Sequence, residues 1–156
     1  MSYNEDMLNA FIATPNKFNW YKMAFNHFEV NSKARWYWNN GAFLGGFWYL
    51  LFRKDLKSAL IILFIELLLG AILPLNIFII VFLFISILIG GFGTFIIYAK
   101  YKKDRSGIEA MFKDKAKRVG VIRIIGGVNP TAYYAGILSM FSLVLIFTSL
   151  FVMSLQ

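Results

Sequence analysis

The 156-residue chain contains no cysteine and a single histidine, His27. Without cysteine it has no disulfide, no thiolate zinc site, no cysteine nucleophile and no conventional iron–sulfur cluster. A lone histidine is also a poor candidate for a metal site. We therefore expect no bound metal and no cofactor.

Charged residues are scarce as well, at 15% of the chain, whereas 59% of the residues are apolar and 19% are aromatic. A domain of this size has a large surface relative to its volume, so it cannot bury so many aromatic side chains. Many of them must therefore face lipid. The same composition excludes a disordered chain. We expect an all-α membrane protein.

Three stretches are apolar enough to cross a bilayer, and they cover residues 58–73, 75–99 and 131–155. A helix rises about 1.5 Å per residue, so a hydrocarbon core of about 30 Å takes roughly 20 residues, and a shorter span thins the bilayer locally. Pro74 separates the first two stretches and predicts a tight turn between antiparallel helices. Asn129 and Pro130 are typical residues for the start of a helix, and they precede the third stretch. The sequence therefore predicts three transmembrane helices.

A fourth apolar run, residues 41–52, would reach only about 18 Å as a helix, which is too short to span. Arg35 precedes this run and Arg53 and Lys54 follow it, and basic residues favour the cytoplasmic side. We therefore predict a short re-entrant or interfacial aromatic helix. The alternative is one continuous helix from Ala42 to Leu73, which would hold the charges of residues 53–55 inside the membrane at a cost of several kcal/mol each.

The sixteen basic residues indicate which parts of the chain stay in the cytoplasm. Seven lie in residues 1–57 and nine in residues 100–123, whereas the Pro74 turn and the last residues contain none. The positive-inside rule then predicts a cytoplasmic N-terminus and an external C-terminus. We divide the chain into a cytoplasmic aromatic amphipathic segment, residues 1–34, and a membrane domain, residues 35–156, which includes a basic cytoplasmic segment, residues 100–129.

Both cytoplasmic segments show helical patterns. Phe18, Tyr21, Phe25 and Phe28 recur every three or four residues and form one aromatic stripe. This stripe is either a membrane-surface anchor or partner groove, or it packs against the protein's own basic loop. In the second segment Ser106, followed three residues later by glutamate, has the spacing of a capping box. A basic amphipathic helix is therefore expected to begin there.

Anionic lipid headgroups are the expected partners of the basic and aromatic residues near the ends of the spans. Nucleic acid is not expected, because the positive charge follows the span ends as membrane topology requires and no nucleic-acid module accompanies it. The residues assigned to this lipid interface are Trp36, Trp38, Trp48, Arg53, Lys54, Lys100, Lys102, Lys103, Lys117 and Arg118.

Glu66 is the one charged residue inside the predicted spans. A carboxylate at that depth is expensive unless it is protonated or finds a partner. Gly70 lies one turn later, and Ser86, Gly90 and Thr94 form a row of small residues on the next span, so these two faces could pack together. Glu66 either forms a structural hydrogen bond or handles protons, ions or lipid.

Catalytic motifs are missing: the chain has no nucleophile elbow, no phosphate-binding loop and no zinc-protease signature. We therefore expect a protein that is not an enzyme and acts as a lipid- or protein-binding accessory or structural component. Three spans make a thin bundle, which favours a homo-oligomer or a subunit of a larger membrane complex. The alternative is an oligomeric pore or small-solute channel that uses Glu66.

The order of residues in one segment, 38–54, also matches a known sequence signature in part. Residues 38–43 read WNNGAF, residues 45–48 read GGFW and residues 49–54 read YLLFRK. This arrangement resembles the W-x-A-F…W-x-x-Y-R-K signature of a family of small bacterial inner-membrane proteins without an assigned function, which includes the HrgC-like proteins. The resemblance covers about Arg35 to Ser149. It implies a bacterial inner-membrane location and no reaction, substrate or catalytic residue.

Overall fold

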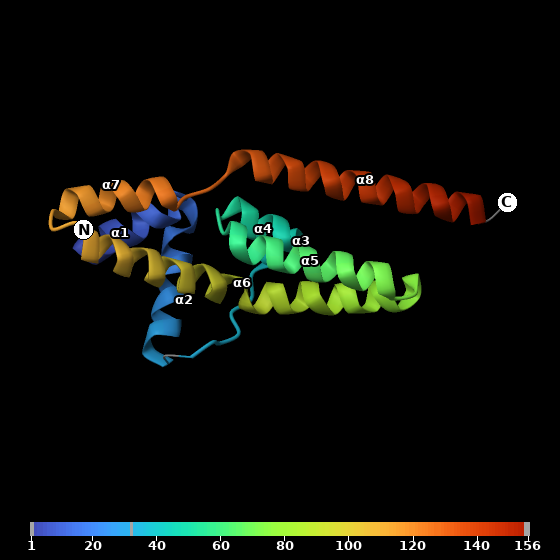
Figure 1. The fold of residues 1–156 in the computed structure, drawn as a ribbon, viewed down its shortest axis with the longest axis horizontal. Helices are drawn as coiled ribbons and strands as arrows, with labels where there is room; N and C mark the ends of the chain where they lie inside the picture. The colour runs from blue at the N-terminus through green and yellow to red at the C-terminus, as the bar shows by residue number, and fades with distance from the viewer. Residues whose placement is uncertain (1, 32, 155–156) are drawn as a thin grey trace.

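The fold of residues 2–31 and 33–154 is given by a computed structural model, and in this part of the chain every regular element is helical. The all-α class predicted from the sequence is therefore confirmed for these residues. The molecule is elongated: α1 (Tyr3–Ile12), α2 (Phe18–Asn31) and α7 (Lys115–Ile125) lie at one end, and α5 (Leu56–Ile72) and α8 (Pro130–Ser154) extend toward the other (Figure 1). α6 (Leu75–Met111) runs through both ends. We call the part formed by α1, α2, α7 and the last third of α6 the head.

The head begins with two helices whose starts are marked in the sequence. Ser2 and Glu5 form a capping box at the start of α1, and Pro15–Lys17 form a short 3-10 turn, η1, ahead of α2. α1 packs against α7, and α2 packs against α6. Tyr21, Phe25 and Phe28 are buried, and the rings of Phe25 and Phe28 contact Phe95 and Tyr98 of α6. The stripe therefore packs inside the protein, mainly on the end of the apolar part of α6, with Tyr101 as its contact in the basic segment.

The aromatic run 41–52 forms two helices instead of the expected single one. α3 (Asn40–Gly45) and α4 (Phe47–Phe52) meet at Gly46, whose φ of 50° and ψ of −129° suit a residue without a Cβ. Asn39 caps α3, because its side-chain oxygen accepts hydrogen bonds from the backbone N–H groups of Gly41 and Ala42. α3 packs on α6, whereas α4 packs on α5 and α8.

α5 and α6 form an antiparallel pair that turns at Pro74, as predicted. α6 continues past Ala99 to Met111, so the prediction that a separate helix begins at Ser106 is wrong. No proline or other helix-breaking residue separates the apolar from the charged part, and two ion pairs at i,i+4 spacing, Lys100–Asp104 and Arg105–Glu109, support the continuation. The next helix, α7, begins after Asp114, whose side chain caps it.

One of the three expected spans has the length and composition of a membrane-crossing helix. Among the described residues, α6 is the one helix that is long and apolar enough to cross a membrane by length and composition. α5 has 17 residues, one turn shorter than a typical span, and α8 has 25. α8 begins at Pro130 with Asn129 accepting from the N–H of Thr131 at 3.1 Å, as predicted. Leu155, the last residue of the expected third span, and Gln156 lie outside the described residues.

The row of small residues on α6 packs against the start of α3 and not against Gly70, which faces Phe78 of α6 instead. The backbone N–H groups of Tyr37 and Asn39 donate to the carbonyls of Gly91 and Gly90, both at 2.8 Å. A Cβ on Gly90 would lie 2.9 Å from the Cβ of Phe43. Side chains larger than hydrogen would therefore hold the two segments apart. Because this face of α6 is covered by its own chain, it is not open for self-association.

Gly90→Ala should lower the free energy of unfolding by about 1–3 kcal/mol, because the added methyl group overpacks the contact with Phe43. Gly107→Ala is the matched control: its position in α6 is exposed with nothing within 4 Å, so alanine should be neutral or stabilise by up to about 1 kcal/mol. Denaturant unfolding of both variants in detergent measures the difference. Equal stability of the two would contradict the close approach.

Candidate functional site

Glu66 lies on α5 with 7% of its surface exposed. Gly46, at the α3–α4 junction, lies beside it: a Cβ built on Gly46 would be 3.9 Å from Glu66 Oε1. Within the described residues its carboxyl group has no hydrogen bond and no ion pair. The structure therefore places Glu66 inside the chain's own packing, beside the turn between α3 and α4.

A polar cluster surrounds Arg53, at the end of α4. Arg53 was assigned to the lipid interface, but only 4% of its surface is exposed. Its Nη1 donates to the carbonyl of Ile12 at 3.0 Å, and its guanidinium carbon lies 4.4 Å from the centre of the Tyr21 ring. Arg53 therefore joins α4 to the head, because its partners belong to α1 and α2.

A chain of side-chain hydrogen bonds runs from Tyr21, whose ring contacts Arg53, toward α6. The hydroxyls of Tyr21 and Tyr49 lie 3.1 Å apart, and Asn39 Nδ2 donates to both Tyr49 and Thr94, each at 3.1 Å. Thr94 is fully buried. We call Tyr21, Asn39, Tyr49, Arg53 and Thr94 the Arg53 cluster. It links α2, α3, α4 and α6 at the point where the head meets the apolar helices.

A cavity of about 430 Å³ lies beside the Arg53 cluster. Its walls come from η1, α2, the start of α3, the end of α4 and the first turn of α8. Lys17 and Arg53 are the charged residues in its lining, and no aspartate or glutamate contributes to it. The cavity is therefore positively charged and rich in aromatic side chains.

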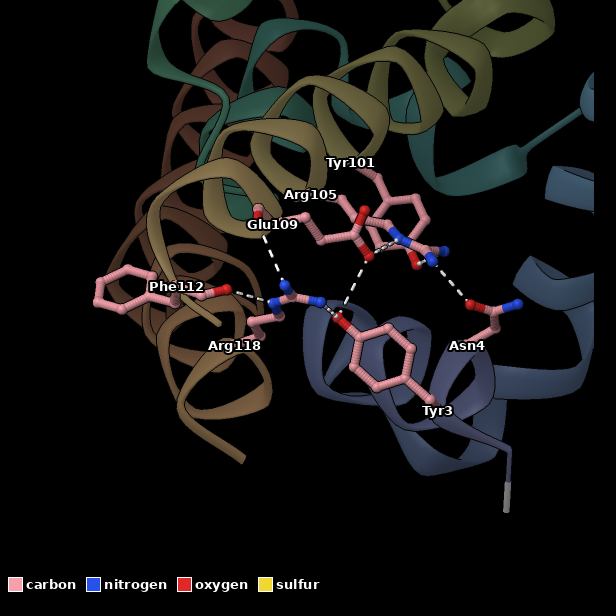
Figure 2. A network of polar contacts seen from close by, with 7 residues as sticks. All are labelled: Tyr3, Asn4, Tyr101, Arg105, Glu109, Phe112 and Arg118. Atoms are coloured by element: carbon pink, nitrogen blue, oxygen red, sulfur yellow. Dashed lines mark hydrogen bonds and ion pairs between the residues drawn. The ribbon is translucent and has the colours of Figure 1, made fainter. Parts of the chain in front are cut away.

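A second polar network fixes the head (Figure 2). Arg105 donates through Nε to Glu109 Oε1 at 2.9 Å, and Tyr3 donates to the same oxygen at 3.2 Å. Arg118 of α7 reaches the carbonyls of Phe112 at 2.6 Å and of Glu109 at 3.3 Å. The network therefore joins α1, α6 and α7. Arg118 was assigned to the lipid interface, but its donors serve this internal network.

The other residues assigned to the lipid interface divide into two groups. Lys54 donates to the carbonyl of Ile124 at 3.1 Å, Lys100 pairs with Asp104 at 2.7 Å, and Trp48 packs on α8 beside Gly136. These three make contacts within the chain, although Lys54 is also exposed. The others, Trp36, Trp38, Lys102, Lys103 and Lys117, are exposed, and of these Trp36 and Trp38 also pack beside Gly91 and Gly90 of α6.

Sequence reasoning missed the partners of Arg53. Tyr21 was seen as part of an aromatic stripe, and Asn39 only as part of a signature. The one available signal was Asn39 directly before an apolar run, which is typical of a helix cap. Nothing in the spacing of residues 12, 21 and 53 indicates that they meet, because they lie on different helices far apart in the sequence.

No family model, no curated protein and no solved structure matches the chain. The likeness of residues 38–54 to the signature of the HrgC-like proteins therefore stays a prediction. Among the described residues, no group of three or more histidine, aspartate or glutamate side chains could hold a metal ion.

Low pH should lower the stability of the head. The hydrogen bond from Lys22 lowers the pKa of Glu5. Partial burial acts to raise the pKa of Glu109, but the hydrogen bond and the charge of Arg105 have the larger combined effect, so the pKa of Glu109 is also lowered. A carboxyl group with a lowered pKa stabilises the fold above its unfolded pKa of about 4.3, and this contribution is lost as the pH falls through the folded value. The thermal midpoint, followed by near-ultraviolet circular dichroism, should therefore drop below about pH 4. The double variant Glu5→Gln, Glu109→Gln should show a smaller drop, and an equal drop would contradict this origin.

Proposed function

We propose that the protein is a multi-pass membrane protein without catalytic activity, which binds lipid or a partner protein through its head and the adjoining membrane surface. The observation that carries this proposal is the exposed apolar surface of α5 and the first part of α6. Soluble monomers rarely expose large continuous apolar patches. Among its members are Leu60, Phe64, Leu67, Leu68, Ile72, Leu75, Ile80, Leu83 and Phe84.

Three crossings, by α5, α6 and α8, account for this surface best. Seventeen residues of α5 reach about 25 Å, which crosses a bilayer with local thinning, and the 25 residues of α8 reach about 37 Å. Between residues 58 and 99 Glu66 is the one charged residue, and residues 124–154 carry none. The basic residues lie in residues 1–57 and 100–123, which supports a cytoplasmic head and an external C-terminus.

A re-entrant path for α3 and α4 is supported by where this segment begins, turns and ends. Asn39 and Arg53, near its two ends, line the same cavity. Gly46, at its middle, lies beside Glu66, ten residues or about 15 Å along α5. A segment that enters to half the depth of α5 and returns has this geometry. The bacterial inner membrane is the location that the family resemblance implies.

The burial of Glu66 favours a binding role over an oligomeric pore. A pore-lining carboxylate has to face a water-filled lumen, whereas Glu66 faces the turn between α3 and α4 of its own chain. α8 leaves Tyr134, Leu138 and Phe141 exposed, and these side chains offer a surface for a second copy or for another membrane subunit. Homo-oligomerisation or assembly into a larger complex follows from this proposal.

Flux from dye-loaded and potassium-loaded vesicles separates the two roles. Vesicles that contain the wild type, Glu66→Gln or the control Glu29→Gln should all leak no faster than empty vesicles, since Glu66 lines no water path. Glu29→Gln makes the same chemical change at an exposed position in α2. Leakage by the wild type that changes in Glu66→Gln but not in Glu29→Gln would support a pore and contradict the binding role.

A further inference from the structure

The cavity beside the Arg53 cluster has the chemistry of an anion site. Lys17, Asn39, Asn40 and Arg53 supply cationic or amide groups to its lining, and no carboxylate opposes them. Trp38 and Tyr133 contribute aromatic walls. A neutral apolar ligand would make no use of these two cations. An anion of small to moderate size fits the volume of about 430 Å³ and the charge.

Arg53 has one edge of its guanidinium group that makes no hydrogen bond to the described residues. Its recorded hydrogen bonds, to Ile12 and Thr14, both come from Nη1. Nε is buried and has no hydrogen-bond partner among the described residues. The Nε–Nη2 edge of arginine is a planar pair of donors that matches two oxygens of one phosphate group. Contacts with Ile12 and Tyr21 hold the guanidinium in place, so the donors are oriented before a ligand arrives.

The position of the cavity along the molecule indicates the kind of anion. Arg53 precedes the start of α5 by three residues, and Tyr133 lies in the first turn of α8. In the proposed topology both helices enter the membrane there, at the level of the lipid headgroups. Tryptophan and tyrosine side chains favour that level.

We propose that this cavity binds a phosphate ester, with the Nε–Nη2 edge of Arg53 and the Nζ of Lys17 on the phosphate oxygens. The headgroup of an anionic phospholipid is the source that the position favours, and a soluble phosphate ester shares its chemistry. The choice of a lipid source rests on the membrane topology proposed above. The presence of a phosphate site does not.

Titration of the full-length protein in a phosphate-free detergent tests the site, with intrinsic tryptophan fluorescence as the readout because Trp20 and Trp38 line the cavity. The probes are dihexanoylphosphatidylglycerol and glycerol 3-phosphate. Arg53→Lys keeps the charge but loses the two-donor edge, and Lys17→Glu changes an exposed side chain. Each should raise the Kd at least about tenfold. Lys57→Glu is the matched control, an exposed lysine near the start of α5 outside the cavity, and should change the Kd less than about twofold.

The two probes distinguish the sources. Tighter binding of the lipid than of glycerol 3-phosphate supports a headgroup site, and equal binding supports a site for a soluble phosphate ester. No binding of either probe by the wild type, or equal weakening by Lys17→Glu and Lys57→Glu, would overturn the proposal. Alkaline extraction of membranes tests the topology separately: release of the chain would contradict membrane insertion, whatever the titrations give.

Discussion

The close approach of residues 36–43 to α6 is the contact on which the rest of the structure depends. Two backbone hydrogen bonds, from Tyr37 and Asn39 to the carbonyls of Gly91 and Gly90, bring the loop and α3 onto the helix. A Cβ on either glycine would clash with the segment that packs on it, at Phe43 for Gly90 and at Trp36 for Gly91. This contact fixes where α3 begins, and through Gly46 it also fixes where α4 returns.

The course of α3 and α4 also brings Arg53 to the head, where the Arg53 cluster forms. Because α4 ends beside α1 and α2, a buried arginine can bind the carbonyl at the end of α1 and stack on a tyrosine of α2. The same hydrogen-bonded chain reaches Thr94 of α6 through Tyr49 and Asn39. A buried charge held in this way is costly to break and orients the head on the apolar helices. The adjoining cavity is positive for the same reason.

The sequence predicted the boundaries of helices better than the tertiary contacts between them. The Pro74 turn and the Asn129–Pro130 start of α8 followed from local rules for proline and helix caps, which act over a few residues. The prediction of a helix start at Ser106 was wrong because α6 continues through this position, supported by its i,i+4 ion pairs, and the capping-box pattern lies in the middle of the helix. The partners of Arg53 and of the glycine row could not be predicted, because they depend on the tertiary packing of helices that are distant in the sequence.

The central claim is that α5 and α6 carry the chain across a membrane and back while the charged head stays on one side. Accessibility of single cysteines tests it most directly, because the native chain contains no cysteine to interfere. With a membrane-impermeant maleimide on intact cells, Asn76→Cys should react, whereas Lys57→Cys and Ser106→Cys should react only after permeabilisation; all three positions are exposed. Equal labelling of all three in intact cells would contradict the account.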